Sequence, residues 1–116
     1  MKTCLDKYAE SLDWLRFSLN PENPMPSVTD WCTLYDFADK QKIIGVCDPT
    51  KHEVKIDLEV LSLWMGATLQ IANYNTLLNK RAVELCQVIE QAGFRCCILK
   101  GQVNAKMYPN PLSRTP

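Results

Sequence analysis

The sequence predicts a mainly helical fold, in which a helical N-terminal region with a long central helix precedes one strand and one short helix. Three observations support this prediction. Apolar residues recur at helical spacing over most of residues 1–92, and one such pattern runs from Leu58 to Ala92 without a proline. A single β-type run, Arg95–Leu99 (RCCIL), then follows. The chain has 116 residues, which is enough for one small domain.

Two helices are predicted before the long one. The first covers Cys4–Leu19, where Leu5, Tyr8, Leu12, Leu15 and Leu19 form one apolar stripe. The proline-containing residues 20–26 must form a loop or an extended connector. The second helix covers Val28–Lys42, with Ser27 as its expected N-cap.

The third helix is the longest predicted element and ends at Gly93, a typical C-terminal stop. Its first half is apolar on most sides, which is typical of a central buried helix. The pattern fits either one rod or two helices broken near Asn73–Asn75, and we expect one rod. We expect two of the three helices to pack along the long one.

The end of the chain is predicted to be a strand at Arg95–Leu99, a short helix at Gln102–Tyr108 and an irregular segment at 110–116. The domain boundary expected from this pattern separates a helical region, residues 1–92, from the start of a second region at 93–116. A lone strand leaves backbone donors and acceptors unpaired. The strand therefore suggests an incomplete chain or a partner strand from another molecule.

Charge and hydropathy exclude some classes of protein. Acidic and basic residues number 13 each, whereas a dedicated nucleic-acid binder normally has a basic surplus, so nucleic acid is not an expected partner. Charges interrupt the apolar residues of 1–20, which therefore do not resemble a signal peptide. The apolar region Val60–Ala72 is too short and too interrupted to cross a bilayer. We expect a cytoplasmic protein with no membrane partner.

The cysteine and histidine content does not favour a metal site. The six cysteines include no CxxC pair, and the chain has one histidine, His52, which we expect to be a solvated loop residue. We expect the cysteines to be reduced and buried, with Cys96 and Cys97 on opposite sides of the strand. Trp14, Trp31 and Trp64 are expected in the core.

The dipeptide Lys100-Gly101 is the candidate for phosphate chemistry. Glycine lets a phosphate approach the backbone, the start of a helix presents free N–H groups, and lysine adds positive charge. From the dipeptide alone, a charged residue at the end of a strand followed by a turn is the favoured explanation, and the phosphate interpretation depends on its context. The P-loop pattern GxxxxGKS/T is absent.

The C-terminal sequence resembles that of a bacterial group of nucleotidyltransferase-like proteins built on the polymerase-β type fold. The family pattern is an apolar strand, Lys-Gly, a short helix, Tyr-Pro and an arginine. The helical region, with Asp30-Trp31 and a long helix ending in Ala-Gly-Phe, is also similar to the family. The matching C-terminal residues are Ile98, Leu99, Lys100, Gly101, Ala105, Tyr108, Pro109 and Arg114.

The resemblance implies that Lys100, Gly101 and Gln102 form the nucleotide-phosphate turn, with Arg114 as a second phosphate or loop-anchoring contact. In the family an Asp-x-Asp pair follows and holds Mg²⁺, but this chain lacks that pair. Asp57 and Glu59 have suitable side chains but lie far away in sequence. No residue present is therefore assigned a catalytic or metal-binding role.

These expectations give a main hypothesis and two alternatives. In the main hypothesis the chain is the N-terminal part of a nucleotidyltransferase-like protein, inactive alone. Mg²⁺ and a nucleoside triphosphate are implied for the complete protein, and neither is expected to bind tightly to this chain. In the first alternative the chain is a helical interaction module that self-associates through the long helix or the open strand edge. In the second it is an anion-binding domain that uses residues 100–102.

Overall fold

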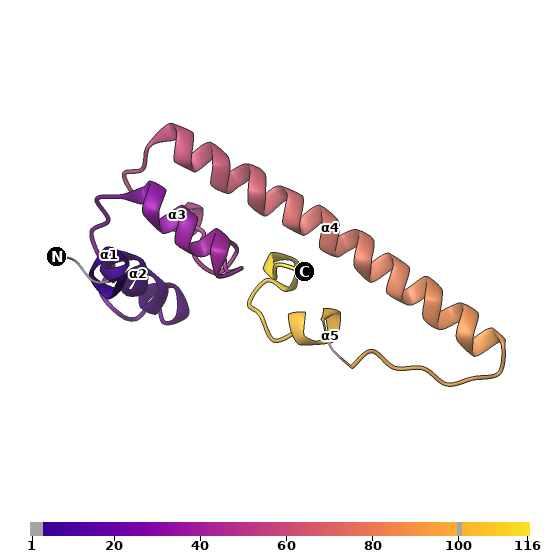
Figure 1. Ribbon diagram of the computed structural model, residues 1–116. Helices are drawn as coiled ribbons and strands as arrows, with labels where there is room; N and C mark the ends of the chain where they lie inside the picture. Colours follow the sequence, from indigo (N-terminus) through magenta and orange to yellow (C-terminus); the bar gives the residue numbers. More distant parts are fainter. Residues whose placement is uncertain (1–3, 100) are drawn as a thin grey trace. The chain divides into compact units, whose positions relative to one another are not determined.

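The computed structural model describes residues 4–99 and 101–116 and is mainly helical (Figure 1). No strand forms among these residues. The elements are α1 (Cys4–Lys7), α2 (Ala9–Leu19), α3 (Trp31–Lys40), the 3-10 turn η1 (Pro49–Lys51), α4 (Leu58–Gln91), α5 (Gln102–Ala105) and the 3-10 turn η2 (Pro111–Ser113).

The long helix α4 is shared by two compact units. The first unit extends to Thr68 and the second covers Leu69–Arg114. Each unit is described separately below. The expected boundary between residues 92 and 93 stays a prediction.

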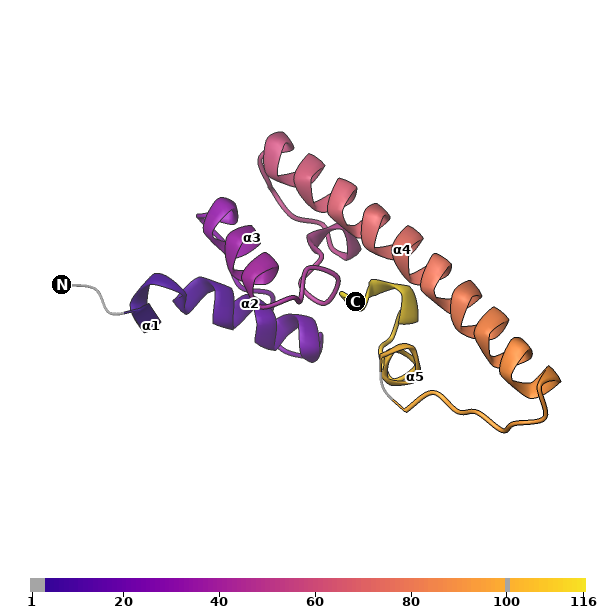
Figure 2. The same cartoon turned by 45° about the vertical axis from the view of Figure 1, so that its right-hand side comes forward.

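The first unit is built around buried aromatic rings from α2, α3 and α4. Trp14 and Trp31 meet edge to face, with ring centroids 5.1 Å apart, and Tyr35 meets Trp64 at 5.2 Å in the same manner. All three tryptophans are buried, which confirms their predicted place in the core. Helices α2 and α3 pack against each other (Figure 2).

The same tryptophans hold the connector between α3 and α4. Each indole N–H donates to a backbone carbonyl of that connector, so a large apolar side chain is buried without leaving its polar atom unpaired. The bonds run from Trp14 to Cys47 (2.9 Å), from Trp31 to Lys55 (2.8 Å) and from Trp64 to Ile44 (2.9 Å).

Helix α3 begins three residues later than predicted, and the prediction that Ser27 caps it is wrong. Asp30 is the N-cap: its carboxylate accepts from the Thr33 N–H at 3.0 Å and the Thr33 hydroxyl at 2.6 Å. Thr29, just before the cap, lies outside the helix, and its N–H donates to the carboxylate of Glu10. The first predicted helix is likewise divided, at Tyr8, into α1 and α2.

Helix α4 is one continuous rod, as predicted (Figure 1). It ends in a Schellman motif, in which the Gly93 N–H donates to Glu90 O (3.0 Å) and the Phe94 N–H to Ile89 O (3.2 Å). Gly93 has φ of 89°, a conformation that glycine adopts without strain. The predicted C-terminal stop is therefore confirmed.

The first half of α4 is more exposed than predicted. Val60 and Trp64 are buried, but Leu63 and Met65 are each 55% exposed and Leu69 is 63% exposed. This part of the helix therefore packs along one side, and the expectation of a central buried helix is wrong. No helix of the described residues is long and apolar enough to cross a membrane.

The predicted strand at Arg95–Leu99 does not form in the described residues. These residues have no regular secondary structure, because the described parts of the chain offer no second strand to pair with them. The short helix is also shorter than predicted, covering Gln102–Ala105. One 3-10 turn, η2, interrupts the segment that we expected to be irregular.

Two side-chain predictions also need correction. Cys32 and Cys97 are exposed rather than buried, and Cys47, Cys86 and Cys96 are free like them. His52 is half-buried, and its ring lies 4.6 Å from that of Phe17 between centroids. It is therefore part of the edge of the aromatic core and not a solvated loop residue.

Candidate functional site

The predicted site residues fall in the second unit. Lys100 lies outside the described residues. Gly101 has φ of 69° and turns the chain into α5, which begins at Gln102. Arg114 directly follows η2 and is half-buried.

Asn75 fastens the Arg114 segment to α4. Its side chain is fully buried, and Nδ2 donates to Leu112 O at 2.8 Å and to Arg114 O at 2.7 Å. A primary amide has two N–H donors, and both are used here. The backbone of Arg114 is therefore fixed by a side chain from the middle of the long helix.

Gln102 fastens the start of α5 to the same helix. Its Nε2 donates to Asn79 Oδ1 at 2.6 Å, and it also lies 3.4 Å from Asn75 O and 3.5 Å from Asn75 Oδ1. Asn75 and Asn79 are one helical turn apart and so lie on one face of α4. The structure thus brings Gln102 and the backbone of Arg114 to neighbouring positions on that face.

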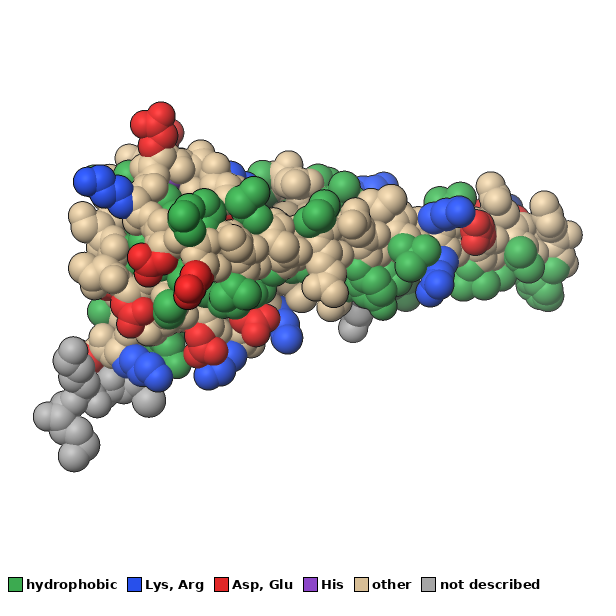
Figure 3. Space-filling model, turned by 90° about the horizontal axis from the view of Figure 1, so that it is seen from above, with side chains coloured by type: hydrophobic (Ala, Val, Ile, Leu, Met, Phe, Trp, Pro, Cys, Tyr) green, Lys and Arg blue, Asp and Glu red, His purple; other side chains and the backbone are tan. Residues whose placement is uncertain are grey.

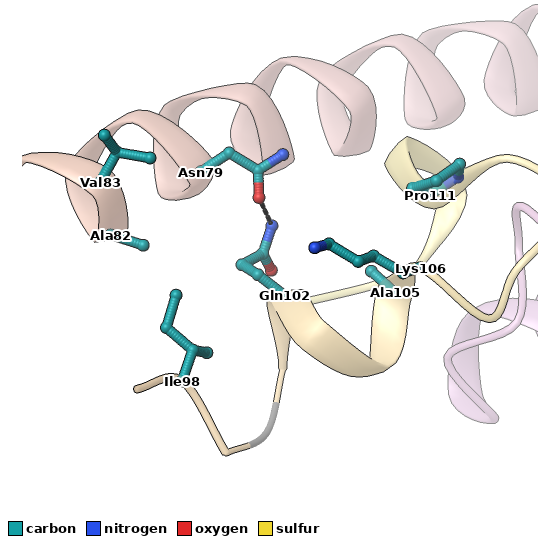
Figure 4. Close-up of a pocket in the computed structure, with 8 residues that line it drawn as sticks. All are labelled: Asn79, Ala82, Val83, Ile98, Gln102, Ala105, Lys106 and Pro111. Atoms are coloured by element: carbon teal, nitrogen blue, oxygen red, sulfur yellow. Dashed lines mark hydrogen bonds between the residues drawn. The ribbon is translucent and has the colours of Figure 1, made fainter. Parts of the chain in front are cut away.

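A pocket of about 390 Å³ opens beside this cluster (Figure 4). Asn79 and Gln102 line it, and Lys106, which directly follows α5, contributes a positive charge that the sequence did not single out. None of its lining residues is acidic. They are Asn79, Ala82, Val83, Ile98, Gln102, Ala105, Lys106 and Pro111.

The arrangement favours an anion over a cation. Lys106 lines the pocket and is exposed, and the Arg114 guanidinium has no carboxylate partner among the described residues. The helix itself contributes little, because α5 is a single turn. The expected contribution from a helix start is therefore small in this structure.

The described residues do not fit Mg²⁺. No group of three or more His, Cys, Asp or Glu side chains among them is arranged to hold a metal ion. Asp57 and Glu59 are exposed at the start of α4, in the first unit. No reaction step is therefore derived through a metal.

The glycine turn, the short helix and the arginine follow one another in the order expected of a nucleotidyltransferase-like protein, and the class itself is given by comparison with known families. The family model described as "Uncharacterised nucleotidyltransferase" matches residues 27–116, and the chain belongs to this family. No curated protein and no solved structure matches the sequence.

Three residues of this cluster were missed by sequence reasoning: Asn75, Asn79 and Lys106. One signal for Asn75 was available. It lies four residues after Ile71 and three before Leu78, and is thus a lone amide on an apolar helical stripe. A polar residue in such a place needs a buried hydrogen-bond partner. No comparable pattern marks Asn79 or Lys106.

Proposed function

We propose that this chain supplies the helical scaffold and part of the nucleotide-phosphate surface of a nucleotidyltransferase-like protein. The surface consists of Lys100, Gly101, Gln102 and Arg114, and the chain is not catalytic alone. The observation that carries the proposal is the hydrogen bonding of Asn75, which joins the Arg114 backbone to the helix face that also holds Gln102. The matched family supplies the nucleotide as the ligand class.

Each residue has a chemical role in this proposal. Gly101 leaves open space where a side chain would otherwise stand, so a phosphate oxygen can approach the backbone. The planar guanidinium of Arg114 suits bidentate hydrogen bonding to phosphate. Lys106 adds a mobile positive charge. The Mg²⁺ site and the rest of the nucleoside triphosphate site belong to the complete protein. We expect this chain alone to bind Mg²⁺ and nucleoside triphosphate only weakly.

Residues 95–99 have a role of their own in the proposal. They become the first strand of an α+β nucleotidyltransferase core when another strand pairs with them. The run of Cys, Ile and Leu there has the composition of a buried strand. A location in the cytoplasm is part of the same proposal and rests on the sequence.

The test measures the binding of inorganic triphosphate to the chain by phosphorus NMR. We expect millimolar affinity for the unaltered chain, and Arg114→Ala should weaken it roughly 10- to 150-fold, the effect of losing about 1.5–3 kcal/mol of charge-assisted hydrogen bonding. Arg16→Ala is the matched control, because Arg16 is an exposed arginine of the first unit. Equal weakening by both substitutions would show that only net charge matters and would refute the proposed site.

Self-association is a second candidate function, favoured by the apolar residues that α4 leaves exposed. Leu77, Leu85 and Val88 are 39%, 60% and 62% exposed, and apolar side chains lie on the surface of this helix (Figure 3). Exposed apolar groups of this kind often mark interaction surfaces. In this candidate two copies of α4 pack through them.

Sedimentation velocity distinguishes the second candidate from the first. A dimer that is lost in Leu85→Glu but kept in Gln87→Glu would support self-association, since both variants add one negative charge. A monomer at all concentrations tested would remove this candidate and leave the first intact.

A further inference from the structure

The segment after α4 turns back along the helix (Figure 1). This turn brings Cys96 close to Cys86. The turn is made by Gly93, with the Phe94 N–H bonded to Ile89 O. Three residues beyond Gly93, the thiol of Cys96 donates to the carbonyl oxygen of Cys86 over 3.8 Å. The Cys96 thiol also has a hydrogen bond with the Cys86 side chain, so the two sulfur atoms are neighbours.

The Cys86 side chain affects the protonation of Cys96. A hydrogen bond with the Cys86 side chain, followed by burial, raises the pKa of Cys96 to about 11. Both side chains are half-buried, and both cysteines are free. Cys97, by contrast, is exposed, as expected from the alternation of side chains along an extended segment.

We propose that Cys86 and Cys96 form a reversible disulfide that fastens residues 94–99 to the end of α4. The thiolate is the attacking form and the pKa of Cys96 is raised, so closure of the disulfide is expected to be faster at higher pH. One protein thiolate attacks a low-molecular-weight disulfide, releasing one reduced thiol and forming a mixed disulfide. The second protein thiolate displaces the other reduced thiol and closes the Cys86–Cys96 bond. The two protein thiols lose two protons and two electrons, and the small disulfide becomes two thiols.

This bond would act on the segment that leads into the Gly101 turn. Residues 94–99 have no regular secondary structure, and Phe94 and Leu99 are 68% and 80% exposed. A covalent link at Cys96 would fix the position of residues 94–99 along α4. The disulfide is independent of the proposed nucleotide function and stands or falls on its own test.

The test is peptide mapping of the full chain after incubation with oxidised glutathione, with free thiols then blocked and the protein digested with trypsin. Cleavage at Arg81, Arg95 and Lys100 places Cys86 on residues 82–95, and both Cys96 and Cys97 on residues 96–100. We expect these two peptides to be linked in the unaltered chain and in Cys97→Ser, and unlinked in Cys96→Ser and in Cys86→Ser.

Two results would overturn the proposal. One is the absence of the linked peptide from the unaltered chain. The other is a linkage that persists in Cys96→Ser and disappears in Cys97→Ser, since this would make the exposed thiol the true partner. A second readout is native trypsin cleavage after Arg95, which should slow severalfold on oxidation of the unaltered chain and recover on reduction.

Discussion

The two units of this chain are stabilised by different interactions. The first buries Trp14, Trp31 and Trp64, and their polar atoms are satisfied by backbone carbonyls. In the second the fully buried residue is an amide, Asn75, and the contacts of Gln102 and Arg114 with α4 are hydrogen bonds. Burial of a large apolar side chain contributes about 1.5–3 kcal/mol, whereas one hydrogen bond contributes about 0.5–1.5 kcal/mol.

This difference has a consequence for function. Hydrophobic packing is non-directional, but an amide hydrogen bond fixes the position of its partner atom. We therefore expect the second unit to be the less stable of the two, with the backbone at Arg114 held in place by hydrogen bonds from Asn75. Regions of low local stability are also the ones that rearrange most readily when a ligand or partner binds.

The largest expected effect comes from removing a ring of the first unit. Trp14→Ala should lower the free energy of unfolding by about 3–5 kcal/mol, because it leaves a cavity and frees the Cys47 carbonyl. Chemical denaturation followed by circular dichroism measures this. Leu19→Ala is the control and should change stability by less than about 0.5 kcal/mol, since Leu19 is 69% exposed. Similar losses in both variants would contradict the assigned core.

Asn75→Ala tests the second unit. Two carbonyls lose their donor, so local stability should fall by about 1–3 kcal/mol, and the amides of residues 101–114 should exchange with solvent roughly 5- to 150-fold faster. Hydrogen–deuterium exchange measures the effect. Asn73→Ala, on an exposed position of the same helix, should leave exchange unchanged. If the two variants exchange alike, Asn75 does not anchor this segment.

A smaller effect is expected at the start of α3. Asp30→Ala should cost about 0.5–2 kcal/mol near neutral pH, whereas Ser27→Ala should cost almost nothing. The hydrogen bond from the Thr33 hydroxyl, followed by that from the Thr33 N–H, lowers the pKa of Asp30 below its ordinary value of 3.8.

The lowered pKa gives this effect a definite pH dependence. The stability that Asp30 contributes is fully present above its unfolded-state pKa and is lost as pH falls through the lower folded-state pKa. Unfolding curves of the unaltered chain and of Asp30→Ala should therefore converge in acid. A constant difference between them down to the lowest pH would contradict the assigned cap.

The smallest effects concern the ends of α3 and α4, which use the same motif with different residues. Lys42 has φ of 60°, and the Ile43 N–H donates to Ala38 O at 2.8 Å, as Phe94 does to Ile89 in α4. Lys42→Gly should therefore raise stability by up to about 1 kcal/mol, and Gly93→Ala should lower it by about 1 kcal/mol. Thermal unfolding measures both, and the same sign for the two changes would contradict this explanation.

Much of the helical architecture could be predicted from the sequence, because apolar spacing and a glycine stop act locally. The single rod of α4 and its end at Gly93 follow from such signals. The cap of α3 was missed although Asp30 and Thr33 are only three residues apart. The contact between Thr29 and Glu10 just before the cap joins residues distant in sequence and left no such local signal. The strand prediction at Arg95–Leu99 was not met, since pairing requires a second strand that the described residues lack.

The candidate site was only partly predictable for the same reason. Gly101, Gln102 and Arg114 were chosen from a family pattern, but the side chains that hold two of them, Asn75 and Asn79, come from a helix more than twenty positions earlier. Hydrogen bonds between such distant residues leave no periodic signal in a single sequence. For Asn75 the available signal was a single amide on an apolar helical stripe, which implies a buried hydrogen-bond partner.

The most direct test of the central claim is nitrogen-15 NMR of the full chain during titration with ATP. If Gly101, Gln102 and Arg114 form one phosphate-binding surface, the amide shifts should concentrate at those residues and at Lys106, with residues 4–68 unaffected. Shifts that fall mainly in residues 4–68, or none in 101–114 at millimolar ATP, would contradict it.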